Sequence, residues 1–186
     1  GNTIVDTVFQ NRALAYEKST VLRSLDLDDE EFALMTAHRA ENVDHPERFT
    51  EILNGAANVA RECNLTLVYS IHPRARKRIE EVNLGVPPGI TLIDPQDYLD
   101  FLRLESAATI ILTDSGGIQE EACILGVPCV TLREETERPE TVSVGANRLA
   151  GIDPDSILAC AQEMLSRSGD WENPFGDGTT AEHIIE

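Results

Sequence analysis

The sequence predicts an α/β fold, in which a parallel β-sheet carries helices on both of its faces. The first observation behind this prediction is the alternation of short apolar runs with helical patterns, repeated five or six times along 186 residues. The second is size and composition, because a chain of this length with 41% hydrophobic residues can bury one large core. The third is that polar, chemically capable residues follow the apolar runs. We therefore expect one domain over residues 1–186 with a ligand site at one edge of its sheet.

The first half of the chain contains three apolar runs separated by helical patterns. Residues 3–18 have apolar side chains at helical spacing and no proline, which predicts a helix within a hinge or linker segment over residues 1–25. Pro46 is expected to open a second helix, ending near residue 62, with one apolar face. Residues 74–82 predict a basic helix. The apolar runs predict strands at residues 32–37, 65–71 and 89–93.

The second half continues the alternation. The patterns predict helices at residues 97–106, 116–125 and 154–166. They predict strands at residues 109–113 and 128–132, and a weaker one at 147–150. Residues 173–186 are expected to form a loop with the sequence NPFGDG and then a terminal helix.

Polar residues follow five successive predicted strands. Right-handed crossovers place the carboxyl ends of parallel strands on one rim, where open α/β sheets bind their ligands. Ordinary loop polarity would account for one or two such segments, but it accounts less well for all five. The segments are His38-Arg39, His72-Pro73-Arg74, Asp94-Pro95-Gln96, Asp114-Ser115-Gly116-Gly117, and Arg133 with the charged loop after it.

The segment from Asp114 to Gly117 predicts an anion site. Glycines without a Cβ atom allow a ligand to approach the backbone, and free N–H groups at a helix start point toward it. Asp114 or Ser115 is also expected to cap the helix through its side chain. These two interpretations are compatible, because the uncapped N–H groups would form the binding surface.

Charged residues near this turn extend the predicted site. Glu120 and Glu121 are expected in the first helical turn, where carboxylates interact favourably with the helix dipole. Glu121 is the better candidate to accept hydrogen bonds from ribose hydroxyl groups. Arg138 lies in the segment TERPE, which is either a solvated surface loop or a diphosphate or sugar contact.

Two histidines end predicted strands on the same rim. His38 can hydrogen-bond a phosphate or transfer a proton near neutral pH, and Arg39 and Glu41 beside it favour a functional role over a structural one. His72 has a similar but weaker case. Neither histidine has a carboxylate or thiol at ligand spacing, so we expect no metal site.

The overall charge limits the ligand classes. A formal net charge of −18 disfavours binding to nucleic acid or to anionic membranes, although it also fits adaptation to high salt. The cations are 13 Arg and 2 Lys, and the planar guanidinium group suits phosphate.

No apolar window approaches a membrane span and no signal peptide is visible, so we expect a cytoplasmic protein. The four cysteines form no CxxC pair and are expected to be reduced, mostly buried thiols. The sequence also lacks the GxGxxG, P-loop and GxSxG motifs, which disfavours nicotinamide binding, ATP hydrolysis and serine-hydrolase chemistry.

Taken together, the motifs resemble those of the non-hydrolysing UDP-N-acetylglucosamine 2-epimerases. The segment at residues 1–3 looks like the hinge of that family, and Ala37 stands where many relatives have glycine. The resemblance covers nearly the whole chain. Its matching segments are TAHRAEN at 36–42, IDPQDY at 93–98, LTDSGGIQEE at 112–121, TERPE at 136–140 and NPFGDG at 173–178.

The resemblance implies a two-domain GT-B enzyme, of which this chain would be the Rossmann-like, UDP-binding C-terminal half. Such enzymes interconvert UDP-GlcNAc and UDP-ManNAc by eliminating UDP to give a 2-acetamidoglucal and then adding it back, without a metal or nicotinamide cofactor. The family's acid and base carboxylates lie in the N-terminal domain. The expectation is therefore that the isolated chain binds UDP weakly and does not epimerise, an expectation that UDP-ManNAc formation by this chain would contradict. A homodimer is expected for the full-length protein.

The resemblance also implies roles for individual residues. Gln96 and Phe101 would lie at the uracil, Ser115, Gly116 and Gly117 at the diphosphate, Glu121 at the ribose and Arg138 at the phosphate or sugar. His38 would be the catalytic histidine, with Arg39, Glu41 and His72 as secondary candidates. A stand-alone nucleotide-sugar binding module and a GT-B glycosyltransferase remain as alternatives.

Overall fold

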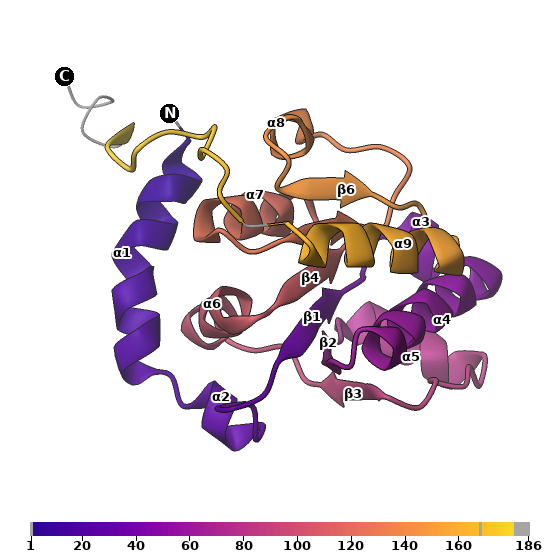
Figure 1. The fold of residues 1–186 in the computed structure, drawn as a ribbon. Helices are drawn as coiled ribbons and strands as arrows, with labels where there is room; N and C mark the ends of the chain where they lie inside the picture. The colour runs from indigo at the N-terminus through magenta and orange to yellow at the C-terminus, as the bar shows by residue number, and fades with distance from the viewer. Residues whose placement is uncertain (1, 168, 181–186) are drawn as a thin grey trace.

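The computed structural model describes residues 2–167 and 169–180, and its centre is a six-stranded sheet (Figure 1). Every pair of neighbouring strands runs parallel, which confirms the predicted parallel α/β fold. The strand order β3-β2-β1-β4-β5-β6 is that of the doubly wound dinucleotide-binding sheets. The strands are β1 (Phe32–Thr36), β2 (Thr66–Ser70), β3 (Ile90–Ile93), β4 (Ile110–Thr113), β5 (Cys129–Thr131) and β6 (Asn147–Leu149).

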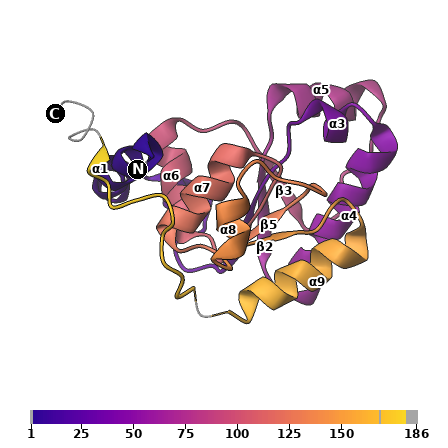
Figure 2. The ribbon, with the colours of Figure 1, turned by 90° about the horizontal axis from the view of Figure 1, so that it is seen from above.

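Helices cover both faces of this sheet, as predicted (Figures 1 and 2). One face carries α4 (Pro46–Glu62), α5 (Pro73–Glu81) and α9 (Pro154–Leu165). The other face carries α2 (Val21–Ser24), α6 (Tyr98–Ala107) and α7 (Gly116–Leu125). The long helix α1 (Thr3–Lys18) packs outside this layer against α6 and α7. Among the described residues, no helix is both long and apolar enough to span a membrane.

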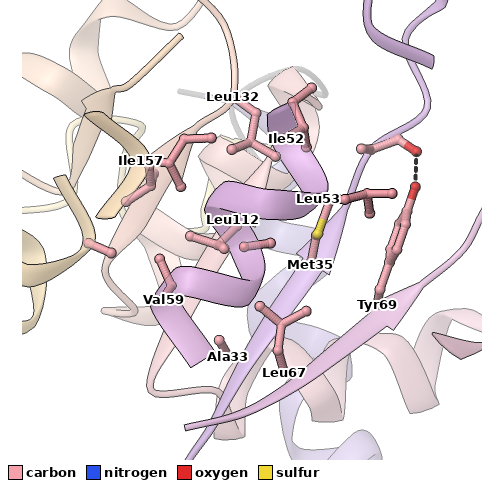
Figure 3. Close-up of a cluster of buried hydrophobic side chains, with 14 of the residues drawn as sticks. Ala33, Met35, Ile52, Leu53, Val59, Leu67, Tyr69, Leu112, Leu132 and Ile157 are labelled. Atoms are coloured by element: carbon pink, nitrogen blue, oxygen red, sulfur yellow. Dashed lines mark hydrogen bonds between the residues drawn. The ribbon is translucent and has the colours of Figure 1, made fainter. Parts of the chain in front are cut away.

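The larger core lies between the sheet and α4 and α9. Figure 3 shows Ile52 and Leu53 of α4 close to Met35 of β1, with Ile157 of α9 nearby. All five residues of β1 are buried, so the strand reads as a continuous apolar run rather than an alternating one. In the same core the buried Tyr69 hydroxyl donates a hydrogen bond of 2.7 Å to the carbonyl oxygen of Ala37 (Figure 3). This bond fixes the backbone directly before His38, the first residue of the predicted site.

The long elements match their predictions and three short helices were missed. The short helices are α2, α3 (Ala40–Val43) and α8 (Pro139–Ser143), and none is longer than five residues. One turn of helix is too short to show an apolar periodicity. The second half of the TERPE segment is therefore helical rather than an open loop. The terminal helix predicted after residue 178 falls largely outside the described residues.

The start of α1 is tied to the loop at residues 173–178 and to α7. The Asn2 backbone N–H donates to the Phe175 carbonyl at 2.9 Å, and its side chain caps α1 by accepting from Ile4. The Asn2 amide also donates to Glu120 of α7 at 2.8 Å. The segment at the start of the chain and the NPFGDG loop, both of which match the family pattern, therefore meet at α7. Ala37, the departure from the family pattern, is not among the residues with positive φ, so its backbone does not require glycine.

Candidate functional site

The predicted rim residues lie near the carboxyl ends of β1 and β4. Between these two neighbouring strands, the order in which the chain adds strands to the sheet reverses its direction. Thr36 and Thr113 are register partners at the ends of these strands, and their hydroxyl oxygens are 2.7 Å apart. His38 follows one strand and Asp114 follows the other. Open α/β sheets bind ligands in the crevice at such a switch point.

Asp114 holds the two strand ends together. Its fully buried carboxylate accepts hydrogen bonds from the backbone N–H groups of His38 and Arg39 and from the Asn42 amide, at 2.9 to 3.1 Å. The His38 Nδ1 atom lies 3.2 Å from the same carboxylate. The carboxylate is therefore the anchor of the His38–Arg39 loop rather than a helix cap or a ligand contact.

The same contacts shift the pKa values of both partners. The hydrogen bond to Asp114 outweighs desolvation and raises the pKa of His38 above its ordinary value of 6.5. Burial opposes ionisation of Asp114, but hydrogen bonds from His38, the Arg39 backbone and Asn42 outweigh it and lower the pKa of Asp114 below 3.8. The contribution of His38 to stability is lost as pH rises through its raised pKa, and that of Asp114 as pH falls through its lowered pKa. Between these limits the pair is ionised, and His38 carries a positive charge at the rim.

The first turn of α7 presents free backbone donors. Ser115 is its N-cap residue but makes no capping bond through its side chain, and Asp114 makes none either, so the expected cap is wrong. Within residues 2–167 and 169–180, no acceptor is found for the backbone N–H groups of Gly116, Gly117 and Ile118. Three uncapped donors at the positive end of a helix form a site for an anion.

The two glycines have no role that the fold itself explains. Neither has a positive φ. A Cβ atom at Gly116 would meet only Glu137 and Arg138 side-chain atoms, at 3.8 and 3.9 Å, and one at Gly117 only the Ser115 hydroxyl at 4.0 Å. These are ordinary van der Waals distances. The fold therefore tolerates a side chain at both positions, and glycine leaves the space in front of these backbone amides open.

A cleft of about 180 Å³ adjoins this turn. The rings of His38 and His72 lie across from each other in it, with their centroids 5.7 Å apart. Its volume is below the roughly 300 Å³ typical of whole-ligand pockets, so it suits one ring or group of a larger ligand. Its lining comes from the ends of three strands, α6 and α7: Thr36, Ala37, His38, Ser70, His72, Pro95, Gln96, Phe101 and Ile118. The structure therefore brings His38, His72, Gln96 and Phe101 together, as predicted. The Gln96 amide donates to the carbonyl oxygen of Asp94 at 2.7 Å, and His72 caps α5 by accepting from Arg74.

An ion-pair network lies on the other side of the turn. Arg133 is nearly buried and donates to Glu41 at 3.1 Å and to Glu137 at 2.8 and 3.0 Å. Arg39 approaches the same Glu137 at 3.3 and 3.4 Å. Hydrogen bonds from Arg133 and the neighbouring positive charges lower the pKa of Glu137 to about 2. Arg133, one of the predicted rim residues, is thus already held by two carboxylates and organises the rim, while the half-buried Arg39 and the exposed Glu41 are bound within the same network.

The two acidic residues of α7 occupy its second turn, so their prediction in the first turn is wrong: the helix begins at Gly116, as predicted, and four residues precede Glu120 in it. Glu120 is buried and lies 2.9 Å from Arg138 Nε, at an angle unsuited to a hydrogen bond. The Arg138 backbone N–H donates to the Thr136 hydroxyl at 3.0 Å, which holds the residue beside α7. Glu121 points between α6 and α7, where Tyr98 hydrogen-bonds it.

The first turn of α7 therefore lies between two groups of predicted residues. Ile118 lines the cleft beside His38, and Gly116 faces the side chains of Glu137 and Arg138. A larger hollow of about 570 Å³ lies at the opposite edge of the sheet, where Arg61 is the one charged residue lining it. The smaller site is the one beside which the helix amides, His38 and Arg138 lie. Sequence reasoning missed the anchoring role of Asp114 and Asn42, for which the one signal is an acidic residue directly after a buried strand.

Comparison with known proteins identifies close relatives. The profile of the UDP-N-acetylglucosamine 2-epimerase family matches residues 1–186. The UDP-N-acetylglucosamine 2-epimerase of Methanocaldococcus jannaschii is 47% identical over 192 residues, covering all of this chain and 52% of that protein. The crystal structure of the M. jannaschii enzyme with UDP-GlcNAc and UDP has a TM-score of 0.92 at 46% identity, over all of this chain and 52% of the other.

A second crystal structure of a UDP-GlcNAc 2-epimerase is also similar to this chain. UDP-GlcNAc 2-epimerase from Neisseria meningitidis bound to UDP-GlcNAc is 34% identical with a TM-score of 0.82, and this chain covers 53% of it. A calicheamicin glycosyltransferase shares the fold alone, at 19% identity and a TM-score of 0.52. The chain spans about half the length of the relatives it matches, as one domain of the GT-B fold does.

Proposed function

Because the chain belongs to the UDP-N-acetylglucosamine 2-epimerase family, we propose that it is the UDP-binding, C-terminal half of an enzyme that interconverts UDP-GlcNAc and UDP-ManNAc. The observation that carries this proposal is the uncapped first turn of α7, where three backbone N–H groups and two glycines face open space. The complexes of two relatives with UDP-GlcNAc, one of them also with UDP, support the ligand class.

The proposed pose runs along the rim. The diphosphate lies on the amides of Gly116 and Gly117 beside Ser115, with Arg138 on the side away from the cleft. The base enters the cleft next to Gln96 and Phe101. The ribose then lies near α7, where Glu121 accepts from its hydroxyl groups. This order matches the positions of the cleft and of Arg138 on opposite sides of the turn.

In the proposed reaction the bond between the anomeric carbon and the diphosphate oxygen breaks, and the proton on C2 is removed. The products are UDP and a 2-acetamidoglucal. Re-addition of UDP after protonation of C2 on the opposite face gives the epimer. The charged His38, held by Asp114, would stabilise or protonate the departing diphosphate. The acid and base for C2 would come from the other domain.

Calorimetric titration of the chain with UDP tests this proposal. We expect saturable binding that Ser115→Ala weakens and that Arg138→Ala weakens about tenfold, or about 1.4 kcal/mol, because a charge-assisted contact is lost. Arg148→Ala is the matched control, since this guanidinium pairs with Glu163 at the far edge of the sheet. Absence of binding at millimolar UDP, or binding that neither site variant changes, would contradict the proposal.

A further inference from the structure

A glutamate with no visible role lies behind the proposed ribose contact. Glu105 of α6 is completely buried, with 0% of its side chain exposed. Neither of its carboxyl oxygens receives a hydrogen bond from an N–H or O–H group of the described residues. A carboxylate in that setting is strongly disfavoured, so Glu105 must hold a proton or acquire a partner.

Among charged side chains, Glu121 has the largest electrostatic effect on Glu105. Helices α6 and α7 pack side by side (Figure 1), and Glu121 of α7 interacts with Tyr98 and Glu105 of α6. Burial and then the charge of Glu121 raise the pKa of Glu105 well above its ordinary value. Burial and then the charge of Glu120 raise the pKa of Glu121 to about 7, although hydrogen bonds from Tyr98 and Glu105 oppose this. Two carboxylates cannot hydrogen-bond each other without a proton, so the pair carries at least one at neutral pH.

The surroundings add little positive charge. Arg138 is the nearby cation, and it is already paired with Glu120. The titratable groups that interact with the pair come from α6, α7 and β5: Tyr98, Glu120 and Cys129. Asp6 is buried on α1, which packs against α6 and α7. None of these groups takes the place of the proton that Glu105 and Glu121 share.

We propose that Glu105 is a positioning residue for the nucleotide: it keeps a proton between α6 and α7, donates it to Glu121, and so directs the free Glu121 oxygen toward the ribose hydroxyl groups. This inference rests on the proposed UDP site. The geometry behind it is a fully buried acid without a donor, on the helix that packs against the one that carries the residue assigned to the ribose.

The arrangement makes the ribose contact dependent on pH. An ionised Glu121 accepts from the ribose hydroxyls, whereas a fully protonated pair offers a poorer acceptor. The contact therefore strengthens as pH rises through about 7, the pKa of Glu121. Glu105→Gln retains a neutral donor to Glu121, so the dependence near neutrality is expected to remain. Glu105→Leu removes the donor, and because the hydrogen bond from Glu105 lowers the pKa of Glu121, the dependence is then expected to move to higher pH.

The test compares UDP with 2′,3′-dideoxy-UDP. Titration of the phosphate and of His38 is common to both ligands, so the ratio of their dissociation constants reports the ribose hydroxyls. We expect the preference for UDP to rise about tenfold between about pH 6 and about pH 8 in the unmodified chain, as the ionised fraction of a group with a pKa near 7 does. Glu105→Gln should show the same rise, whereas in Glu105→Leu, which offers no donor, the preference is expected to stay low over this range. Glu51→Gln, exposed on α4, is the control and should follow the unmodified chain.

The outcomes separate the two proposals. If UDP does not bind, the proposed site and this inference both fail. If UDP binds with the same pH dependence in Glu105→Leu, or with none in the unmodified chain, only the inference is overturned. Carbon-13 NMR of the carboxyl groups in the unmodified chain requires no variant. Glu105 should remain protonated through neutral pH while Glu121 titrates near 7, and an ionised Glu105 at neutral pH would also overturn it.

Discussion

The double replacement Gly116→Ala/Gly117→Ala is expected to reduce UDP affinity by at least about thirtyfold while leaving the fold as stable as before or more stable. Each added methyl group fits the folded chain, since nothing lies closer than 3.8 Å to its position. Alanine is also the better helix former, by roughly 0.5–1 kcal/mol per residue. The methyl groups would instead occupy the space in which the diphosphate meets the backbone amides. Losing one or two charge-assisted hydrogen bonds, at about 1.5–3 kcal/mol each, gives the expected loss.

Calorimetry measures the affinity, and thermal or denaturant unfolding measures the stability. Gly85→Ala is the matched control, because a Cβ there meets nothing within 4 Å and the residue lies away from the site. It should leave binding unchanged. Unchanged UDP affinity in the double variant would show that the ligand does not approach this turn. A large loss of stability would show that the glycines serve the fold instead.

The second large effect concerns Asp114. Replacing it by alanine should lower the free energy of unfolding by about 3–5 kcal/mol, since the change breaks the ion pair with the half-exposed His38 and leaves several donors without an acceptor. The backbone N–H groups of His38 and Arg39 and the Asn42 amide would all lose their acceptor. The His38 loop would lose its anchor to β4, so UDP binding should fall as well.

Chemical denaturation measures this effect, with Asp153→Ala as the control. Asp153 is an exposed cap of α9 that accepts one bond from Ser156, at 2.8 Å. Losing such a cap costs about 1 kcal/mol. Equal destabilisation by the two changes would refute the anchoring role of Asp114.

The fold was predictable because each long element carries its own signal. Strands buried on both faces appear as apolar runs, and α4 shows a clear apolar face after its proline. The rim residues followed from topology, because parallel strands share one carboxyl edge. The order of the strands was not predictable, since apolar runs do not encode which strand pairs with which.

The details of the site depended on contacts between distant residues. The carboxylate of Asp114 could cap the adjacent helix or bind the loop at residues 38–42, and only the packed structure shows that the loop prevails. Glu105 is likewise an ordinary acidic residue within a predicted helix until the packing of α6 against α7 buries it. Neither contact leaves a local pattern in the sequence.

The central claim is that the first turn of α7 holds the diphosphate. An amide NMR titration of the isotopically labelled chain with UDP tests it most directly. The largest shifts are expected at the backbone N–H groups of Gly116, Gly117 and Ile118, with smaller ones along the cleft that His38 and Phe101 line. Shifts confined to another region, such as the hollow beside Arg61 at the opposite edge of the sheet, would contradict it.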